Sequence, residues 1–555
     1  MPPLAPSFTQ DLTYDDYPKD QYRDQIKPPR PSDPFGALSW VRSKSTDVMV
    51  GKARGPPQVR RVSRSALLLA ILASSLYILY SYRSGVLLFR SSTSTSNPNP
   101  VDPLYEARIS FWSSIYPNIV QNKPQCEPFR PVAGNPVGFD STKHDELRPD
   151  RLAISPEQAT ELRSSHQRFT AHLVSANYTL PFTPHTRGIV TTAGGQYLPV
   201  ALLSLRMLRA TGSQLPVEVF LASHSEWDSQ ICGIIFPTLN ARCIVLEDIF
   251  NPSGQEAAPS INKYQYKIMS ILFSSFEEVL FLDSDCFPVF DPSVYFKTKP
   301  FRTTGMIRWP DFWFPSEHSK FFEIAGIPQP ELWAQASTES GELFYAKKNH
   351  TNSLLLALYY NIYGPDFYYP LQSQGNPGEG DKETFVWSAV AFNETFHSVQ
   401  KPVQALGYRS KAGEWRGSAM IQFDPLEDLH NQKSLKSPAV ADEDRGKMPV
   451  RPAFVHVNFP KIDPGSIFDD VSFGVTGPTK DTDGRLRRIW HEDAQGSIAY
   501  FGYDLERKLW EVVKEIACEY EETILAWQGK TAICERATQY WDTVFAQEDS
   551  RSISG

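Results

Sequence analysis

The sequence predicts an α/β domain in which a mainly parallel sheet is flanked by helices. The first sign is a strand, helix, strand order: RGIVTT from Arg187, an amphipathic helix ending at Gly212, then LPVEVFLA up to Ala222. The second sign is that this alternation repeats, with the strand ARCIVLED and the helical NKYQYKIMSILFSSF preceding an apolar strand that ends at Leu282. Such alternation is typical of parallel sheets, which bind ligands at the carboxyl ends of their strands.

Composition limits the classes of protein that the chain can represent. It has 555 residues, of which 41% are hydrophobic and 21% charged, enough to bury one large or two ordinary domains. The net charge of −8 argues against a general nucleic-acid binder. None of the six cysteines forms a CxxC zinc pattern.

The N-terminal part is predicted to be a membrane-anchored tail. Residues 1–64 show no sustained hydrophobic period, so we expect a disordered cytoplasmic tail. The apolar run from Ser65 to Tyr82 is long enough to cross a thin bilayer, and we place the anchor at residues 65–89. More basic residues precede the run than follow it, which predicts that the rest of the chain is luminal or extracellular.

Beyond the anchor, we expect a luminal stem over residues 90–184 and a folded domain over residues 185–545. Helical pieces such as Ser155 to Leu173 lie among proline-rich connections in the predicted stem. Sequons at Asn177, Asn349 and Asn393 fit luminal exposure. In such a compartment Cys232 could pair with Cys243, and Cys518 with Cys534.

Two aspartates at the end of a strand are the central motif. In EEVLFLDSDCFPVFDP, the apolar run up to Leu282 is followed at once by Asp283, Ser284 and Asp285. Carboxylates in this position can share one divalent cation and its bound diphosphate. A strand-end turn with a capping aspartate is the plainer interpretation of such a triplet, so other segments must decide.

Several further residues are candidates for the same site. Gly194 and Gly195 follow the first strand, where a nucleotide could approach the backbone, although an ordinary glycine turn explains them equally well. Lys267, on the helix before the DSD strand, could meet diphosphate charge or belong to a solvated helical face. The aromatic segment MIRWPDFWFP around Asp311 suits either sugar recognition or an aromatic core.

Two C-terminal segments complete the set. In GEGDKETFVWSAVAF, Asp381 and Glu383 precede an apolar helix predicted to begin near Phe385, where charged residues often serve only as caps. In PAFVHVNFPKIDPG, His456 lies on a short strand and is followed by Lys461. A neutral imidazole could complete a metal site held by two aspartates, and a lysine could stabilise a departing diphosphate. A lone histidine on a strand is more often a core residue.

Taken together, these segments resemble the fungal Golgi α-mannosyltransferases of the MNN type. The resemblance rests on the following segments, which occur in the same order as in that family: TTAGGQYLPVALLSLRMLRATGSQLPVEVF, FEEVLFLDSDCFPVFDP, RWPDFW, ESGELFYAKKNH, GEGDKETFVWSA and FVHVNFPK. It covers roughly His185 to Gly465. It implies a GT-A-like fold with a mixed, mainly parallel sheet, GDP-mannose as donor, Mn²⁺ as cofactor, and a type II Golgi membrane protein.

The resemblance also implies roles for single residues. Asp283 and Asp285 match the metal-binding Asp-x-Asp of that family, and Asp381 and Glu383 match a segment that looks like part of the acceptor and sugar face. His456 and Lys461 look like the C-terminal metal ligand and diphosphate partner of related retaining transferases. Cys286 and the segment after Gly465 match no part of the family pattern.

The sequence therefore predicts a metal-dependent retaining transferase that moves mannose from GDP-mannose to a mannosylated glycan acceptor, through an α-1,2 or α-1,3 linkage. Asp381 or Glu383 would act near the anomeric carbon. Complexes with other mannosyltransferases are conceivable, and no nucleic-acid partner is expected. The alternatives are a UDP-sugar-dependent transferase on the same fold, a non-catalytic membrane-anchored lectin or scaffold, and a cytoplasmic-facing adaptor.

Overall fold

The computed structural model describes residues 104–132, 137–251, 261–376, 380–435 and 449–546. The predicted cytoplasmic tail and membrane anchor, residues 1–64 and 65–89, lie outside the described residues. Within the described ranges, no helix is both long and apolar enough to cross a membrane.

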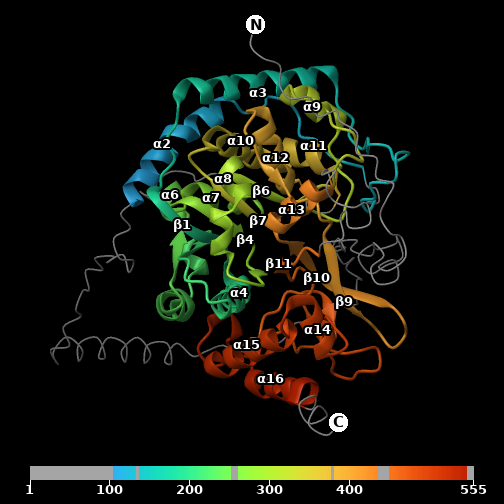
Figure 1. Ribbon diagram of the computed structural model, residues 1–555. Coiled ribbons are helices and arrows are strands. Elements are labelled where there is room, and N and C mark those ends of the chain that lie inside the picture. Colours follow the sequence, from blue (N-terminus) through green and yellow to red (C-terminus); the bar gives the residue numbers. More distant parts are fainter. Residues whose placement is uncertain (1–103, 133–136, 252–260, 377–379, 436–448, 547–555) are drawn as a thin grey trace, which may run out of the picture. The chain divides into compact units, whose positions relative to one another are not determined.

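A seven-stranded mixed sheet forms the centre of the fold (Figure 1). The strand order is β3-β2-β1-β4-β7-β6-β8. Neighbouring strands are parallel from β3 to β4 and between β6 and β8, whereas β7 runs antiparallel to both β4 and β6. The prediction of a mainly parallel α/β sheet is confirmed. The strands are β1 Thr183–Thr192, β2 Val217–Leu221, β3 Ala241–Val245, β4 Phe276–Leu282, β6 Met306–Pro310, β7 Thr338–Ala346 and β8 His397–Ser398.

Alternate side chains of the central strands enter two separate cores. On β1, Ile189 belongs to one hydrophobic cluster and Val190 to the other; on β4, Leu280 and Phe281 divide in the same way. Successive residues of a strand point to opposite faces, so a continuous apolar run predicts a strand that is covered on both sides.

Helices from the predicted stem, and from the predicted domain up to Ala391, cover the face that carries Val190. In Figure 1 these helices lie together above the sheet. They are α2 Tyr105–Gln121, α3 Pro156–Ala176, α6 Glu247–Phe250, α7 Gln265–Phe273, α9 Ser319–Ala325, α10 Thr351–Ile362, α11 Tyr369–Ser373 and α12 Asp381–Ala391.

Helices α2 and α3 belong to this core although they fall in the range predicted as a stem. Phe111 and Trp112 of α2, and Leu162 and Phe169 of α3, are buried in the same cluster as the sheet residues. The helix predicted from Ser155 is confirmed, with a capping box between Ser155 and Gln158 at its start. The aromatic and leucine side chains of these helices cover apolar surface of α7 and α10, so α2 and α3 contribute to the domain core.

A second, antiparallel sheet and the C-terminal helices cover the opposite face (Figure 1). The second sheet has the order β5-β11-β10-β9. Its strands are β5 Cys286–Pro288, β9 Gln404–Arg409, β10 Trp415–Phe423 and β11 Pro452–His456, beside a separate pair β12 Val471–Ser472 and β13 Val475–Thr476. The remaining helices are α4 Leu198–Ala210, α5 Phe236–Thr238, α8 Lys299–Thr304, α13 Pro425–Leu435, α14 Ala494–Phe501, α15 Leu505–Tyr520 and α16 Ile533–Trp541.

Both disulfides considered from the sequence are present. Cys232 is bonded to Cys243, and Cys518 to Cys534. Among the described cysteines, Cys126 and Cys286 are free thiols. Two disulfides are the expected cysteine usage of a domain that folds in an oxidising compartment.

Candidate active site

The Asp-x-Asp segment joins the two sheets at the end of β4. Asp283 follows the last residue of β4, and its N–H donates to the carbonyl of Gly341 on β7 at 2.8 Å. The N–H of Cys286 then closes a tight turn onto the Asp283 carbonyl at 2.9 Å. The carbonyl of Asp285 accepts from the N–H of Val457 at 2.8 Å. Because the backbone is held on both sides, the two carboxylates have fixed positions.

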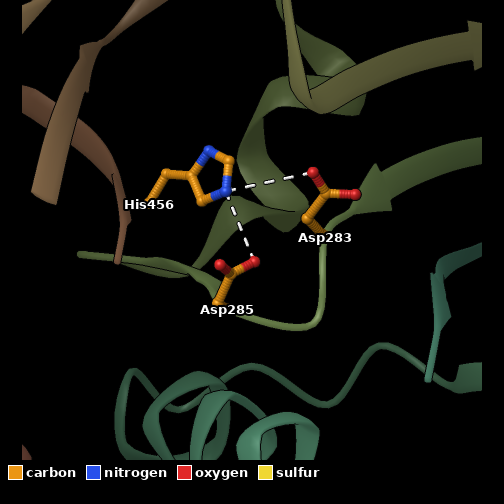
Figure 2. Close-up of side chains that lie close together, drawn as sticks. All are labelled: Asp283, Asp285 and His456. Carbon is orange, nitrogen blue, oxygen red and sulfur yellow. Dashed lines mark ion pairs between the residues drawn. The ribbon is translucent and has the colours of Figure 1, made fainter. Parts of the chain in front are cut away.

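The second sheet brings His456 to these carboxylates (Figure 2). His456 is the last residue of β11 and pairs with Cys286 of β5, directly beside the motif. Its Nε2 lies 3.3 Å from Asp285 Oδ1 and 3.9 Å from Asp283 Oδ2. The three side chains offer ligand atoms within 4.8 Å of one another. Two carboxylates and an imidazole are a donor set that suits a divalent ion such as Mn²⁺ or Zn²⁺.

Charges on the cluster balance one another. Burial lowers the pKa of His456, but Asp285 and Glu339 outweigh it and hold that pKa well above its usual range. Burial likewise raises the pKa of Asp285, and the stronger opposing charges of Lys461 and His456 hold it below its usual value. Lys461 Nζ forms an ion pair with Asp285 Oδ2. The structure therefore brings Asp283, Asp285, His456 and Lys461 together.

Lys267 lies on the other side of the cluster and is almost fully buried. Its Nζ is 3.3 Å from Asp283 Oδ1 and 3.7 Å from Asp381 Oδ2, and it donates to the Ser340 carbonyl at 2.8 Å. Burial lowers the pKa of Lys267, but Asp283 and Asp381 raise it above its usual range. In this position the lysine links two carboxylates through an internal contact, whereas the sequence predicted a contact with diphosphate.

The structure separates Asp381 from Glu383. Helix α12 begins at Asp381, four residues earlier than predicted, so both residues are helical and two positions apart. Side chains at that spacing do not face each other on a helix. Asp381 faces Lys267, and burial, opposed by Lys267, raises the pKa of Asp381 to about 6.

Glu383 contacts a different part of the fold. Its carboxylate accepts from the N–H of Thr338 at 2.7 Å and from the Thr338 hydroxyl at 3.1 Å. None of the contacts described for it joins it to Asp283, Asp285 or His456. These bonds attach α12 to the start of β7, so the structure does not bring Glu383 into the cluster as the sequence predicted.

Asp311 is also occupied within the protein. Its carboxylate forms an ion pair with Lys382, and it accepts from the N–H of Phe312 at 2.6 Å. Both charged side chains are buried. Of the two interpretations of the aromatic segment, the core fits this arrangement better than a sugar contact through Asp311.

The Gly194–Gly195 turn lies beside the cluster. A Cβ atom on Gly194 would lie 2.3 Å from the carboxyl carbon of Glu226, and Gly195 has a φ of +52°. Both positions therefore favour glycine. Two residues later, the ring of Tyr197 lies 6.0 Å from Lys461 Nζ, which places this turn next to the diphosphate candidate.

Glu339 is a site residue that the sequence did not predict. Its Oε1 lies 3.5 Å from His456 Nδ1, on the side of the ring opposite the two aspartates. Burial raises the pKa of Glu339, but its interaction with the neighbouring His456 outweighs burial and lowers that pKa to about 2. The only signal in the sequence is an acidic residue two positions before Gly341, at the polar start of the strand.

Glu339, Glu342 and His456 form a second group with ligand atoms within 4.8 Å. Glu342 is fully buried, and burial raises its pKa well above the usual range, which makes it a poor ligand compared with Asp283 and Asp285. Asp283, in contrast, keeps 27% of its side chain exposed. A substrate can therefore reach a cation between Asp283 and Asp285, which makes that group the better candidate metal site.

Comparisons with known sequences place the chain in a family. The family model Mannosyl_trans3, described as "Mannosyltransferase putative", matches residues 186–332 and 331–424. The chain is 30% identical over 513 residues to alpha-1,2-mannosyltransferase MNN21 of Candida albicans, covering 80% of this chain and 76% of that protein. This chain belongs to the same mannosyltransferase family. It is therefore a hexosyltransferase, and the resemblance inferred from its motifs is confirmed.

A second relative and two solved structures are similar to this family member. It is 29% identical to alpha-1,2-mannosyltransferase MNN2 of Saccharomyces cerevisiae, over 66% of this chain and 70% of that one. The galactosyltransferase LgtC, solved with donor and acceptor sugar analogs, shares 15% identity and a TM-score of 0.25 over 36% of this chain and 70% of its own. Mouse xyloside xylosyltransferase 1 shares 11% identity and a TM-score of 0.26 over 38% and 85%. The family assignment rests on the sequence relatives, and the fold on the strand order described above.

Proposed function

We propose that this mannosyltransferase-family member transfers mannose from GDP-mannose to a mannose-terminated glycan with Mn²⁺ as cofactor, and that its domain is GT-A-like. The observation that carries the proposal is the group of Asp283, Asp285 and His456 at the carboxyl end of β4, with Lys461 beside it. Both relatives are named as alpha-1,2-mannosyltransferases, which favours an α-1,2 linkage over an α-1,3 linkage.

The residues present fit a divalent cation. Asp283 and Asp285 would supply carboxylate oxygens and His456 its Nε2, since these atoms already converge. Bound there, the ion would offset negative charge on the diphosphate as the sugar departs. Asp283 is the most exposed of the three ligands, so it faces the side from which the nucleotide must enter.

In this proposal, Lys461 can contact either Asp285 or the diphosphate of the donor. Without a cation, it helps His456 to neutralise the buried charge of Asp285. When Asp285 binds a cation, Lys461 is released for the diphosphate, whose charge grows in the transition state. Its side chain is 26% exposed, so the ammonium group can reach a ligand from its present position.

Asp381 is the better candidate for the group near the anomeric carbon. GDP-mannose is an α-linked donor, so an α-linked product requires retention, by front-face attack or through a covalent intermediate. Asp381 contacts Lys267, which in turn contacts the metal-binding Asp283, whereas Glu383 is bonded to Thr338. A carboxylate at Asp381 could orient the acceptor hydroxyl or stabilise positive charge on the sugar ring.

We also propose a type II Golgi membrane protein with a luminal catalytic domain. The two disulfides support an oxidising compartment. The asparagines of all three sequons, Asn177, Asn349 and Asn393, are exposed and thus open to glycosylation. The predicted anchor and its flanking charges supply the orientation.

The test uses the purified full-length chain in detergent. Calorimetry should show binding of GDP that requires Mn²⁺, with UDP binding at least tenfold more weakly. Incubation with GDP-mannose and a short α-mannoside should then yield a product extended by one α-1,2-linked mannose, identified by linkage analysis. Tighter binding of UDP would indicate the UDP-sugar alternative, and the absence of any nucleotide binding would favour a lectin or scaffold.

A further inference from the structure

We infer that Glu339 is a positioning residue that orients His456 for metal binding, an inference that rests on the proposed function. The imidazole ring lies between two sets of carboxylates. Its Nε2 faces Asp285 and Asp283, and its Nδ1 faces Glu339 Oε1 at 3.5 Å. A histidine that binds a metal through one nitrogen commonly donates its other N–H to a carboxylate, which fixes both the tautomer and the ring orientation.

The backbone holds the Glu339 carboxylate in a single orientation. Its Oε1 accepts from the N–H of Ser340 at 3.0 Å and from the N–H of Gly341 at 2.6 Å. Because this oxygen has two fixed donors, its position beside His456 does not depend on a flexible side chain alone. The carboxylate is also buried, which strengthens its attraction for an N–H donor.

Gly341 provides the space for this arrangement. A Cβ atom at this position would lie 2.4 Å from His456 Nδ1 and 3.0 Å from Glu339 Oε1. Every other residue type would therefore push the ring away from the strand. The Gly341 carbonyl also accepts the N–H of Asp283, so one short segment positions the imidazole and one of the aspartates.

The consequence concerns which nitrogen carries a proton. With Nδ1–H directed to Glu339, Nε2 presents its lone pair toward the gap between Asp283 and Asp285 when its proton leaves. Without Glu339, both tautomers become accessible and the ring can rotate, so only part of the population presents Nε2. Loss of such a supporting group typically weakens metal binding by roughly 10- to 100-fold.

Two substitutions test the inference in the full-length chain. Glu339→Ala removes the acceptor, whereas Glu339→Gln retains an oxygen that can accept from Nδ1–H and from both backbone N–H groups. The affinity for Mn²⁺ is measured by electron paramagnetic resonance titration in the presence of GDP. We expect Glu339→Ala to weaken Mn²⁺ binding about 10- to 100-fold and Glu339→Gln to recover it to within about fivefold of the unchanged protein.

The control is Glu278→Gln, which removes a partly buried carboxylate from the opposite end of β4, where it pairs with Arg187 and Arg302. It should leave Mn²⁺ affinity unchanged within twofold. Equal losses in Glu339→Ala and Glu339→Gln, or an unchanged affinity in Glu339→Ala, would overturn the inference. If Asp285→Asn abolishes Mn²⁺ binding while Glu339→Ala retains it, the inference fails and the proposed function stands. If the unchanged protein binds no Mn²⁺, the proposed function fails.

Discussion

The two ends of strand β4 are both surrounded by buried ionisable side chains, but these side chains have different kinds of partner. At the carboxyl end, Asp283 and Asp285 contact side chains: Lys267, Lys461 and His456. At the amino end, the fully buried Lys347 contacts backbone, donating to the carbonyls of Leu272 at 2.9 Å and Ser274 at 2.8 Å.

Other charges at the amino end also have backbone partners. Arg108 donates to the Phe273 carbonyl at 2.5 Å, and Glu218 accepts from the N–H of Ser275 at 2.8 Å while pairing with Arg242 and Arg108. These groups connect α2, α7 and β2, and their partners are fixed parts of the chain. A charge with backbone partners has no reason to exchange them, so this end is structural.

The difference indicates how a functional cluster can be distinguished from a structural one. Side-chain partners can be exchanged for a ligand, since Lys461 can leave Asp285 when a cation takes its place. Carboxylates gathered around one histidine also store repulsion that a bound cation relieves. The contrast predicts that changes at the carboxyl end affect activity and those at the amino end affect stability.

The largest expected effect is loss of activity in the double variant Asp283→Asn, Asp285→Asn. Because the amides cannot offset diphosphate charge through a cation, kcat/KM should fall by roughly 10³-fold or more, about 4 kcal/mol. The free energy of unfolding in EDTA should change by less than about 2 kcal/mol, since the shape is kept. Mannose transfer and chemical denaturation measure the two effects. Asp470→Asn, at an exposed carboxylate, is the control; undiminished transfer by the double variant would contradict the mechanism.

The next effect is on stability at the other end of β4. Lys347→Met leaves buried carbonyls of Leu272 and Ser274 without their donor, so the free energy of unfolding should fall by about 2–4 kcal/mol. Below the unfolding transition, kcat/KM should stay within about threefold. Denaturant titration tests this, with the exposed neighbour Lys348→Met as the control. A loss of activity without a loss of stability would show that the two ends are not divided in this way.

The smallest expected effect concerns Glu383. It tests whether Glu383 has a structural role while Asp381, on the same helix α12, acts in the reaction. Burial, with the charge of Glu317, raises the pKa of Glu383 to about 8 from an ordinary value of 4.5. The folded protein therefore holds this proton more tightly than the unfolded chain. Its contribution to stability is complete below about pH 4.5 and is lost as the pH rises through about 8.

Glu383→Gln should accordingly show a smaller fall in the free energy of unfolding between pH 5 and pH 8. Its kcat/KM at pH 7 should stay within about threefold, because its partner Thr338 lies outside the metal cluster. Asp381→Asn should lower kcat/KM by more than about 100-fold. Urea denaturation across the pH range and transfer assays measure these outcomes. Comparable losses of activity in both variants would restore Glu383 to the catalytic group predicted from the sequence.

Local patterns predicted much of the fold. The strands and helices from Arg187 to Leu282 follow from hydrophobic period and helix-ending glycines, and they are confirmed as β1 to β4 with α4 and α7. Asp283 and Asp285 were found because they directly follow an apolar strand. Such signals lie within a few residues of each other, which is where sequence periodicity carries information.

Long-range contacts limited the prediction of the site. That β11 would pair with β5 and place His456 beside Asp285 required a second sheet that no local pattern indicates. Glu339 is identified only by the ring it faces across that contact. Lys267 was expected to meet diphosphate charge or to lie on a solvated helical face, and only the packing of α7 shows that its ammonium group is enclosed. The predicted location of the Glu383 side chain depended on where α12 begins, and the ends of helices are the part of a sequence pattern that is hardest to assign.

The loop that carries Lys461 is supported by the C-terminal segment that the family resemblance left unexplained. The indole N–H of Trp527 donates to Asp463 at 2.8 Å, and a Cβ on Gly465 would lie 2.2 Å from the same indole nitrogen. Anyone preparing a shortened protein for crystallography should therefore retain this tryptophan and the helices around it. A protein shortened just after Gly465 would keep every recognised motif but would lose the C-terminal residues that support the loop carrying Lys461.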